Sequence, residues 1–259
     1  FPKYEELKSE VEELRADLVK LYFEYDELRF VICPNIEMQY MLALGALEYK
    51  LYETQCKMLR LKRKIELIQV KLNRQEKPDV SEIEEQLDEE FAEYQDLLEM
   101  QIEAMNEALD RSKGKVLSSE DRKELKTLYR EIVKALHPDL NPDLSRAEID
   151  LFANAVEAYK NADLNAIRII AEMMGDGELS DESDNALAYL TKERERLQAL
   201  IDHIKEEICI IKKCFPYNRR DIIKDSAKIE KKKQKFKRHQ KLYEEKIELY
   251  KAKIAEMLE

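Results

Sequence analysis

Residues 4–32 read YEELKSEVEELRADLVKLYFEYDELRFVI, and this stretch decides the fold class. Its apolar side chains recur at alternating intervals of three and four residues; they are Tyr4, Leu7, Val11, Leu14, Leu18, Leu21, Tyr25, Leu28 and Ile32. Such a heptad pattern is typical of a long helix that buries one stripe of its surface against a partner helix. The stretch therefore predicts a coiled coil.

The composition of the 259-residue chain also favours long, solvated helices. Charged residues make up 39% of the chain, whereas it holds only 4 Gly and 6 Pro. Sheets, tight turns and glycine-rich phosphate loops need these two residues, so a Rossmann domain, a TIM barrel or a β-sandwich is disfavoured. The net charge of −11 disfavours overall binding to nucleic acid or to an anionic membrane.

The sequence points to a cytoplasmic, non-enzymatic protein. No apolar run approaches the roughly 18 residues that span a membrane, and the start does not resemble a secretory signal. The 4 cysteines and 3 histidines are too scattered for a disulfide framework, a metal site or a catalytic triad. We therefore expect reduced thiols, no metal, no cofactor and no membrane partner.

Heptad seams at both ends of the chain predict two antiparallel coiled-coil hairpins. In the first hairpin, Cys33-Pro34-Asn35 ends the opening helix, and a second seam runs from Tyr40 to Leu72. In the second, a seam from Leu187 to Ile211 is followed by a break at 214–218 and a returning helix from Ile222 to Met257. Each seam closes either within the chain or in a homodimer. The two hairpins either reflect a duplication or merely look alike.

Residues 78–112 read as one acidic helix. The segment from Pro78 to Asp110 contains 13 acidic residues and no Lys or Arg. Its acidic face is either solvated or the electrostatic partner of a basic helix elsewhere in the chain. In the second case it would shield the basic helix at 121–136 or the basic C-terminal run.

The middle of the chain contains a short basic helix and a proline-rich loop. Between Asp121 and Leu136, one face of the helix carries Lys126, Arg130 and Lys134 at intervals of four. The loop that follows reads His137-Pro138-Asp139-Leu140-Asn141-Pro142. A further helix then places Phe152, Val156 and Tyr159 at the spacing of a buried face.

This middle segment resembles the J domain of DnaJ-type co-chaperones over roughly residues 120–162. Leu128–Asp139 is similar to the second helix of that family and its His-Pro-Asp tripeptide, and Phe152–Tyr159 is similar to its third helix. The resemblance implies a J-like domain at 113–175 that binds a DnaK-type heat-shock ATPase. Such contact triggers ATP hydrolysis and closes the ATPase on its client.

The resemblance also implies a docking surface for the ATPase. This docking surface consists of Lys126, Tyr129, Arg130, Lys134, His137, Pro138, Asp139 and Asn141. Its three cations would attract an acidic surface on the ATPase, and Tyr129 matches a family position at the interface. Asp139, exposed on the loop, would be the specific electrostatic contact. Pro138 would fix the loop, and His137 would order it by hydrogen bonding.

The chain departs from the family pattern at three points. Leu136 stands where the family usually has an aromatic residue, and Leu140 stands where it has a basic one. The family's Tyr-x-x-Leu-Gly first helix is absent, and we expect the acidic helix at 78–112 to take its place. These departures predict weaker binding, or binding to one particular ATPase.

The last helix carries a basic run that offers possible phosphate contacts. These are Lys231, Lys232, Lys233, Lys235, Lys237 and Arg238. Three interpretations of this run stay open: it binds the phosphates of a nucleic acid, it pairs with the acidic helix, or it is solvated.

Taken together, these patterns predict an all-α protein with a J-like domain flanked by two long antiparallel coiled-coil hairpins. The hairpins occupy 1–77 and 185–259, and an acidic linker lies at 176–184. The predicted function is that of a co-chaperone whose hairpins bind an unknown client or position the protein. Two alternatives stay open: a coiled-coil scaffold with a degenerate J-like domain, and a nucleic-acid binder that uses the basic C-terminal helix.

Overall fold

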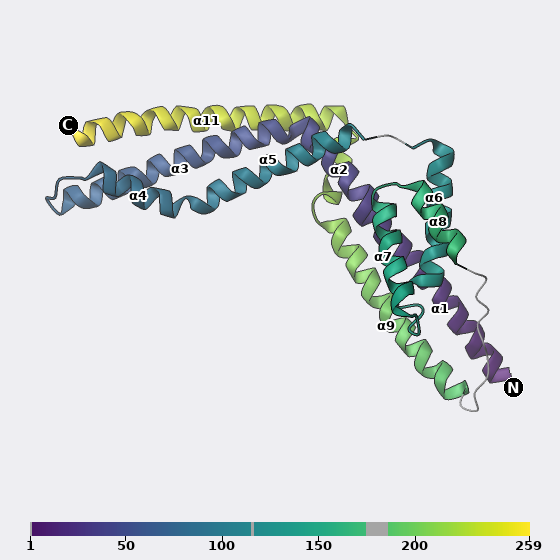
Figure 1. The fold of residues 1–259 in the computed structure, drawn as a ribbon. Coiled ribbons are helices and arrows are strands. Elements are labelled where there is room, and N and C mark those ends of the chain that lie inside the picture. Colours follow the sequence, from purple (N-terminus) through teal and green to yellow (C-terminus); the bar gives the residue numbers. More distant parts are fainter. Residues whose placement is uncertain (1, 115–116, 175–185) are drawn as a thin grey trace. The chain divides into compact units, whose positions relative to one another are not determined.

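The computed structural model describes residues 2–114, 117–174 and 186–259, and these residues form helices joined by loops, without a strand (Figure 1). The predicted all-α fold class is therefore confirmed. The chain divides into two compact units. The first contains the described residues up to Asn35 and those from 117 to Asn218, and the second contains Ile36–Gly114 and Arg219–Glu259. The predicted linker at 176–184 lies outside the described residues.

The first unit combines a long helical pair with a small helical group. Its elements are α1 (Pro2–Asp26), the π-helical segment η1 (Glu27–Ile32), α6 (Ser119–Leu136), α7 (Arg146–Lys160), α8 (Leu164–Met173) and α9 (Ala186–Lys213). Helix α1 packs lengthwise on α9, while α6, α7 and α8 pack against one another and α6 also packs on α1 (Figure 1). Leu18 of α1, Ile132 of α6 and Leu197 of α9 are all 0% exposed in one shared core.

Ion pairs show that α1 and α9 run parallel. Arg15 lies 3.0 Å from Glu193, and Glu24 lies 2.6 Å from Lys212, so the residue numbers rise together along the two helices. A parallel pair cannot be joined by a short turn, because the connection must return over the full length of the helices.

The second unit contains another parallel pair. Its elements are most of α2 (Cys33–Tyr40), the π-helical segment η2 (Met41–Gly45), α3 (Ala46–Asn73), α4 (Val80–Glu90), α5 (Ala92–Ser112), α10 (Arg220–Ile223) and α11 (Ser226–Leu258). Helix α11 packs along α3 (Figure 1). Phe236 shares a cluster with Met41, and Ile254 shares another with Ile68, so the numbering again rises in the same direction on both helices.

The structure corrects the two predicted hairpins, at 1–77 and 185–259. Helix α1 pairs with α9 rather than with α3, and α3 pairs with α11. The error has a physical cause: a heptad repeat specifies that a stripe is buried, but it does not specify which helix covers that stripe. In this structure each seam closes within one chain, against a helix from its opposite end.

The predicted stop at Cys33-Pro34-Asn35 is also corrected, because one helix runs from Tyr4 to Asn73. Before the proline, the N–H of Cys33 donates to the carbonyl oxygen of Leu28, five residues back, as in a π-helix. In a regular α-helix, a proline ring clashes with the carbonyl group four residues earlier. The wider π-helical turn relieves this clash, so the helix continues through Pro34.

Contrary to the expectation from sequence, this long helix contains an 18-residue window apolar enough to cross a membrane by length and composition alone, with mean hydropathy 1.3. One such window is weak support for membrane insertion, because the core helix of a soluble protein passes the same test. The helix supplies Leu28 to the core of the first unit and Leu44 to a core cluster of the second. Packing in both units therefore accounts for part of its apolar character, since 33% of the window is buried.

The predicted acidic helix at 78–112 consists of α4 and α5, and carboxylates of α4 pair with basic side chains of α3. Arg60 lies 2.7 Å from Asp88, and Arg63 lies 2.8 Å from Glu90. These ion pairs identify α3 as the electrostatic partner that the sequence left open. The expectation that the acidic helix replaces the first J-like helix is corrected too, because the long helix that packs on α6 is α1.

Candidate functional site

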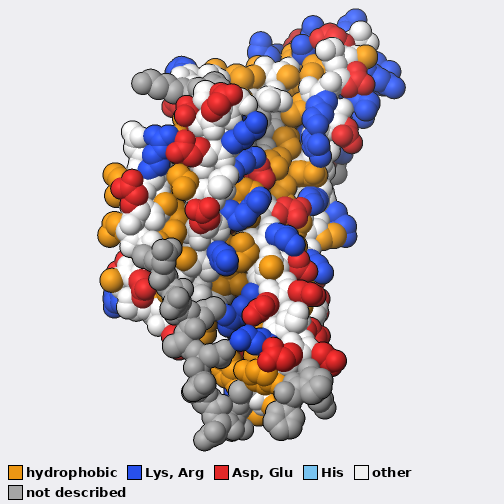
Figure 2. Space-filling view, turned by 90° about the vertical axis from the view of Figure 1, so that its right-hand side faces the viewer, with side chains coloured by type: hydrophobic (Ala, Val, Ile, Leu, Met, Phe, Trp, Pro, Cys, Tyr) orange, Lys and Arg blue, Asp and Glu red, His pale blue; other side chains and the backbone are white. Residues whose placement is uncertain are grey.

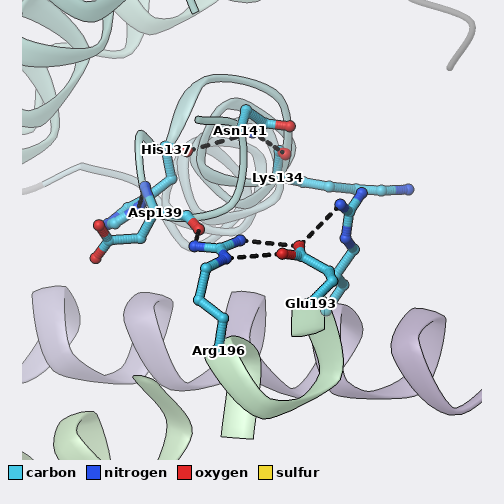
Figure 3. Close-up of polar contacts among 7 residues, drawn as sticks. Lys134, His137, Asp139, Asn141, Glu193 and Arg196 are labelled. Atoms are coloured by element: carbon cyan, nitrogen blue, oxygen red, sulfur yellow. Dashed lines mark hydrogen bonds and ion pairs between the residues drawn. The ribbon is translucent and has the colours of Figure 1, made fainter. Parts of the chain in front are cut away.

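The loop after α6 is a turn built from its own polar groups (Figure 3). The backbone N–H groups of Leu140 and Asn141 both donate to the carbonyl oxygen of His137, each at 3.0 Å. The side-chain amide of Asn141 donates to the carbonyl oxygens of Lys134 at 3.0 Å and His137 at 3.3 Å, and so caps the end of α6. The N–H of Asp139 donates to Nδ1 of His137 at 3.2 Å. This bond leaves Nε2 as the protonated nitrogen of a neutral imidazole.

The two leucines that depart from the family pattern anchor this loop. Leu136 is 5% exposed and Leu140 is 3% exposed, and both belong to the core of the first unit. Burying a leucine side chain contributes about 1.5–3 kcal/mol to stability. At Leu140 the chain therefore has an internal anchor in the place where the family pattern has a charged residue.

Tyr22 of α1 covers the loop. Its ring stacks on the imidazole of His137, with centroids 3.8 Å apart and planes inclined by 25°. Its hydroxyl donates a hydrogen bond to the carboxylate of Asp139. Phe152 of α7 meets the same imidazole edge-on at 5.1 Å. His137 therefore lies between aromatic rings from two helices, and the carboxylate of Asp139 already has an internal donor although the residue is exposed.

A second contact to the loop comes from α9 (Figure 3). Arg196 donates to the backbone carbonyl oxygen of Asp139 at 2.7 Å. Glu193 holds this guanidinium through two hydrogen bonds, at 2.7 and 2.9 Å, and accepts a third from Arg15 of α1 at 3.0 Å. Hydrogen bonds from Arg196 lower the pKa of Glu193, which is 6% exposed. The loop backbone is thus tied to the α1–α9 pair by a charged network.

The basic stripe of α6 also faces α1. Lys126 forms an ion pair with Glu27, and the guanidinium of Arg130 lies over the ring of Phe23, 4.6 Å from its centroid. Lys134 is exposed, and its side chain extends away from the loop in Figure 3. Two of the three predicted cations of the docking surface are therefore engaged, Arg130 by α1 and Lys126 by the first residue of η1.

Tyr129 lies in the core, which corrects its predicted place at a partner interface. Its side chain is 0% exposed, and its ring stacks on Tyr159 with centroids 4.0 Å apart. Its hydroxyl donates to the carboxylate of Asp26 at 2.7 Å. Burial raises the pKa of both Tyr129 and Asp26. The contacts of Tyr129 are with α1 and α7, so this residue holds the helical group on α1.

The pH dependence of His137 offers a test of this enclosure. Burial lowers the pKa of His137 from 6.5 to about 4, against the opposing effect of the Asp139 charge. Because the folded-state value lies below the unfolded one, the contribution to stability is complete above pH 6.5 and is lost as the pH falls toward 4. We expect this contribution to be about 1–3 kcal/mol.

NMR titration of the ring protons, assigned with His137→Gln, measures this pKa directly. In Tyr22→Ala the imidazole of His137 is no longer covered by the tyrosine ring, so the pKa of His137 is expected to rise toward that of an exposed imidazole. A value near 6.5 in the unmodified protein would mean that the imidazole is solvated and would contradict the structure.

Sequence reasoning missed the residues that contact this site from α1 and α9. They are Tyr22, Phe23, Asp26, Glu27 and Arg196. A signal was present in α1, because Val19, Tyr22 and Phe23 lie outside the heptad seam and form a second apolar stripe. A helix with two apolar stripes packs on two sides, here on α9 and on α6. Arg196 gave no comparable signal.

The possible phosphate contacts of α11 do not act as one group. Lys232 lies over the rings of Tyr40 and Phe236, at 5.2 and 5.5 Å, and Lys233 pairs with Glu230 at 3.0 Å. The exposed members are Lys231, Lys235, Lys237 and Arg238. On the face drawn in Figure 2, which is the right-hand side of Figure 1, basic, acidic and hydrophobic side chains are intermingled. These observations offer little support for a nucleic-acid site.

Comparisons of the chain with protein-family models, with curated proteins and with solved structures found no match. Function is therefore inferred from the site and from the resemblance of residues 120–162. The site is a hydrogen-bonded turn at the end of a basic helix, covered by α1 and tied to α9.

Proposed function

We propose that this chain is a J-domain-type co-chaperone that binds a DnaK-type ATPase and stimulates its ATP hydrolysis. One observation supports this proposal most: the His-Pro-Asp loop is a hydrogen-bonded turn at the C-terminal end of a basic helix. Asp139 and Lys134 are exposed there, so the loop offers one anion and one cation to a partner. A short polar turn held by a rigid scaffold is a common form of recognition site.

The helical group around the loop supports the same proposal. Helices α6 and α7 pack against each other through the stacked rings of Tyr129 and Tyr159, and α8 packs on both. A capping box formed by Ser145 and Glu148 fixes the start of α7 and therefore the length of the loop before it. A helix, a His-Pro-Asp loop and a second packed helix occur here in the order that the resemblance implies.

In the proposed mechanism this chain contributes binding, and the ATPase carries out the chemistry. Lys134, Lys126 and Arg130 attract an acidic surface of the ATPase and speed its approach. Asp139 then makes a charge-assisted hydrogen bond to a basic group of the ATPase. Binding that favours the hydrolysis-competent conformation of the ATPase shifts its population toward that conformation. The parallel helical pairs would bind a client or position the complex.

A second candidate function is a structural scaffold whose J-like group no longer docks. The burial of Tyr129 and the hydrogen bond from Tyr22 to Asp139 favour this candidate, since both use docking-surface residues internally. The two candidates differ in one property: only the co-chaperone changes the rate of an ATPase.

We expect Asp139→Asn and His137→Gln each to reduce the stimulation of ATP hydrolysis at least about 10-fold. Loss of one partner of a charged contact, as in Asp139→Asn, costs about 2–5 kcal/mol. His137→Gln removes the stacked imidazole whose Nδ1 accepts from the N–H of Asp139 and so orders the loop. The measurement is a single-turnover assay with a purified DnaK-type ATPase and the full chain. Asp143→Asn is the matched control, since it makes the same change at an exposed acidic residue of the same loop. Its stimulation should equal that of the unmodified chain.

Wild-type stimulation by both variants would show that the loop is not the docking element. No stimulation by the unmodified chain or by any variant would favour the scaffold instead.

A further inference from the structure

Three of the four side chains that the proposed function assigns to the ATPase, Lys126, Arg130 and Asp139, already contact α1 or the first residue of η1. Tyr22 stacks on His137 and donates to the carboxylate of Asp139. One turn further along the helix, Glu27 pairs with Lys126. All these contacts come from residues 22–27, at the end of α1 and the start of η1, so this stretch covers the loop and the Lys126–Arg130 part of the basic stripe of α6.

The covering stretch has the chemistry of an acidic, aromatic protein surface. Phe23 receives the guanidinium of Arg130 on its ring at 4.6 Å, and Glu27 supplies a carboxylate to the neighbouring lysine. An ATPase surface that attracts the same cations must offer the same kinds of group. Helix α1 and the ATPase would then compete for one set of partners on α6.

We propose that residues Tyr22–Glu27 mask the docking surface as an intramolecular competitor, and that the ATPase binds after Tyr22 has released the His-Pro-Asp loop. This inference rests on the proposed function and adds the regulation of the same site. It differs from the shielding by the acidic helix that the sequence suggested, because the carboxylates of α4 pair with α3 and the covering residues belong to α1 and η1.

Release of the loop uncovers part of the core, since Tyr22 is 9% exposed and belongs to it, but it requires no movement of the aromatic cluster beside Tyr22. Tyr22 contacts the loop, whereas the adjacent Phe23 lies among the rings of Tyr129 and Tyr159, with centroids 6.5 and 6.3 Å away. The Tyr22 side chain and the loop can therefore separate while this aromatic cluster stays packed. Arg196, which donates to the carbonyl oxygen of Asp139, is the other contact that must open.

The test compares full-length variants in the single-turnover ATPase assay. Tyr22→Ala removes the stacked ring and the hydroxyl, Tyr22→Phe removes only the hydroxyl, and Glu27→Gln removes only the charge. Glu124→Gln is the matched control, because Glu124 also forms an ion pair from α6, with Arg168 of α8 at 2.6 Å, and leaves α1 untouched. We expect Tyr22→Ala to lower the half-maximal concentration for stimulation about 5-fold or more, the range of typical coupling between sites.

Tyr22→Phe and Glu27→Gln are expected to give smaller shifts in the same direction, and Glu124→Gln is expected to give none. The conservative variants keep the test valid if Tyr22→Ala does not fold. Equal stimulation by the unmodified chain, Tyr22→Phe and Glu27→Gln would overturn masking and leave the proposed function in place. An equal gain in Glu124→Gln would also overturn it, because loosening of α6 in general would explain the effect. Absence of stimulation in every variant would overturn the proposed function and, with it, the masking.

Discussion

Substitution of Tyr129 by alanine is expected to lower the free energy of unfolding by about 3–5 kcal/mol. The side chain is 0% exposed and stacks on Tyr159 with ring planes inclined by only 8°, so alanine would leave a cavity in the middle of the first unit. It would also remove the donor to the carboxylate of Asp26, which is 9% exposed. A buried acceptor without its donor adds to the loss of stability.

Two conservative variants separate these contributions. Tyr129→Phe keeps the ring and removes only the bond to Asp26, so we expect a loss of about 1–3 kcal/mol. Tyr159→Phe makes the same change on the facing ring, whose hydroxyl has no hydrogen-bond partner among the described residues, and is expected to leave stability nearly unchanged. Urea denaturation followed by circular dichroism measures all three. A loss below about 1 kcal/mol for Tyr129→Ala would mean that the side chain is exposed and free for a partner.

Ile68→Asp is expected to destabilise the second unit by about 4 kcal/mol or more, because a charge would enter an apolar cluster. Ile68 is 0% exposed and packs with Ile83, Leu87 and Ile254, so one side chain joins α3, α4 and α11. Val70→Asp is the control, since Val70 lies on the same helix and is 45% exposed. We expect it to change stability by less than about 0.5 kcal/mol.

Thermal unfolding of the two variants, monitored by helical circular dichroism, tests the packing of α3. Ile68→Asp should lose part of its helical signal at a temperature at which Val70→Asp remains folded. Indistinguishable unfolding curves would show that α3 does not bury this face.

The heptad pattern predicted burial well and pairing poorly. Leu18 and Leu197 were both expected in seams, and both are 0% exposed. The same pattern could not tell that α1 and α9 share one core, because an apolar stripe fits any complementary stripe. The predicted helix stop at Pro34 was wrong for a related reason. Whether a proline ends a helix depends on the hydrogen-bond register of the residues before it, and the sequence alone does not reveal that register.

In the candidate site, too, local features were predictable and long-range contacts were not. Local sequence placed the loop at the end of a basic helix, where α6 in fact ends at Leu136. It could not reveal Tyr22, which is 117 residues away from Asp139 along the chain. The burial of Tyr129 was within reach, because Tyr129 shares the apolar face of its helix with Leu125 and Ile132; the family resemblance placed it at the interface instead. Residues of this loop were therefore predictable as a turn, but their internal partners were not.

The parallel pairing within each unit has a consequence for the nascent chain during translation. Arg15 and Glu193 are 178 residues apart in sequence, and Glu24 and Lys212 are 188 residues apart. Translation is sequential, so the apolar stripe of α1 leaves the ribosome long before α9 exists to cover it. Contacts at such separation form late, and unpaired apolar stripes favour aggregation in the interval. The nascent protein would thus itself be a substrate for cellular folding factors until residues 186–213 have been translated.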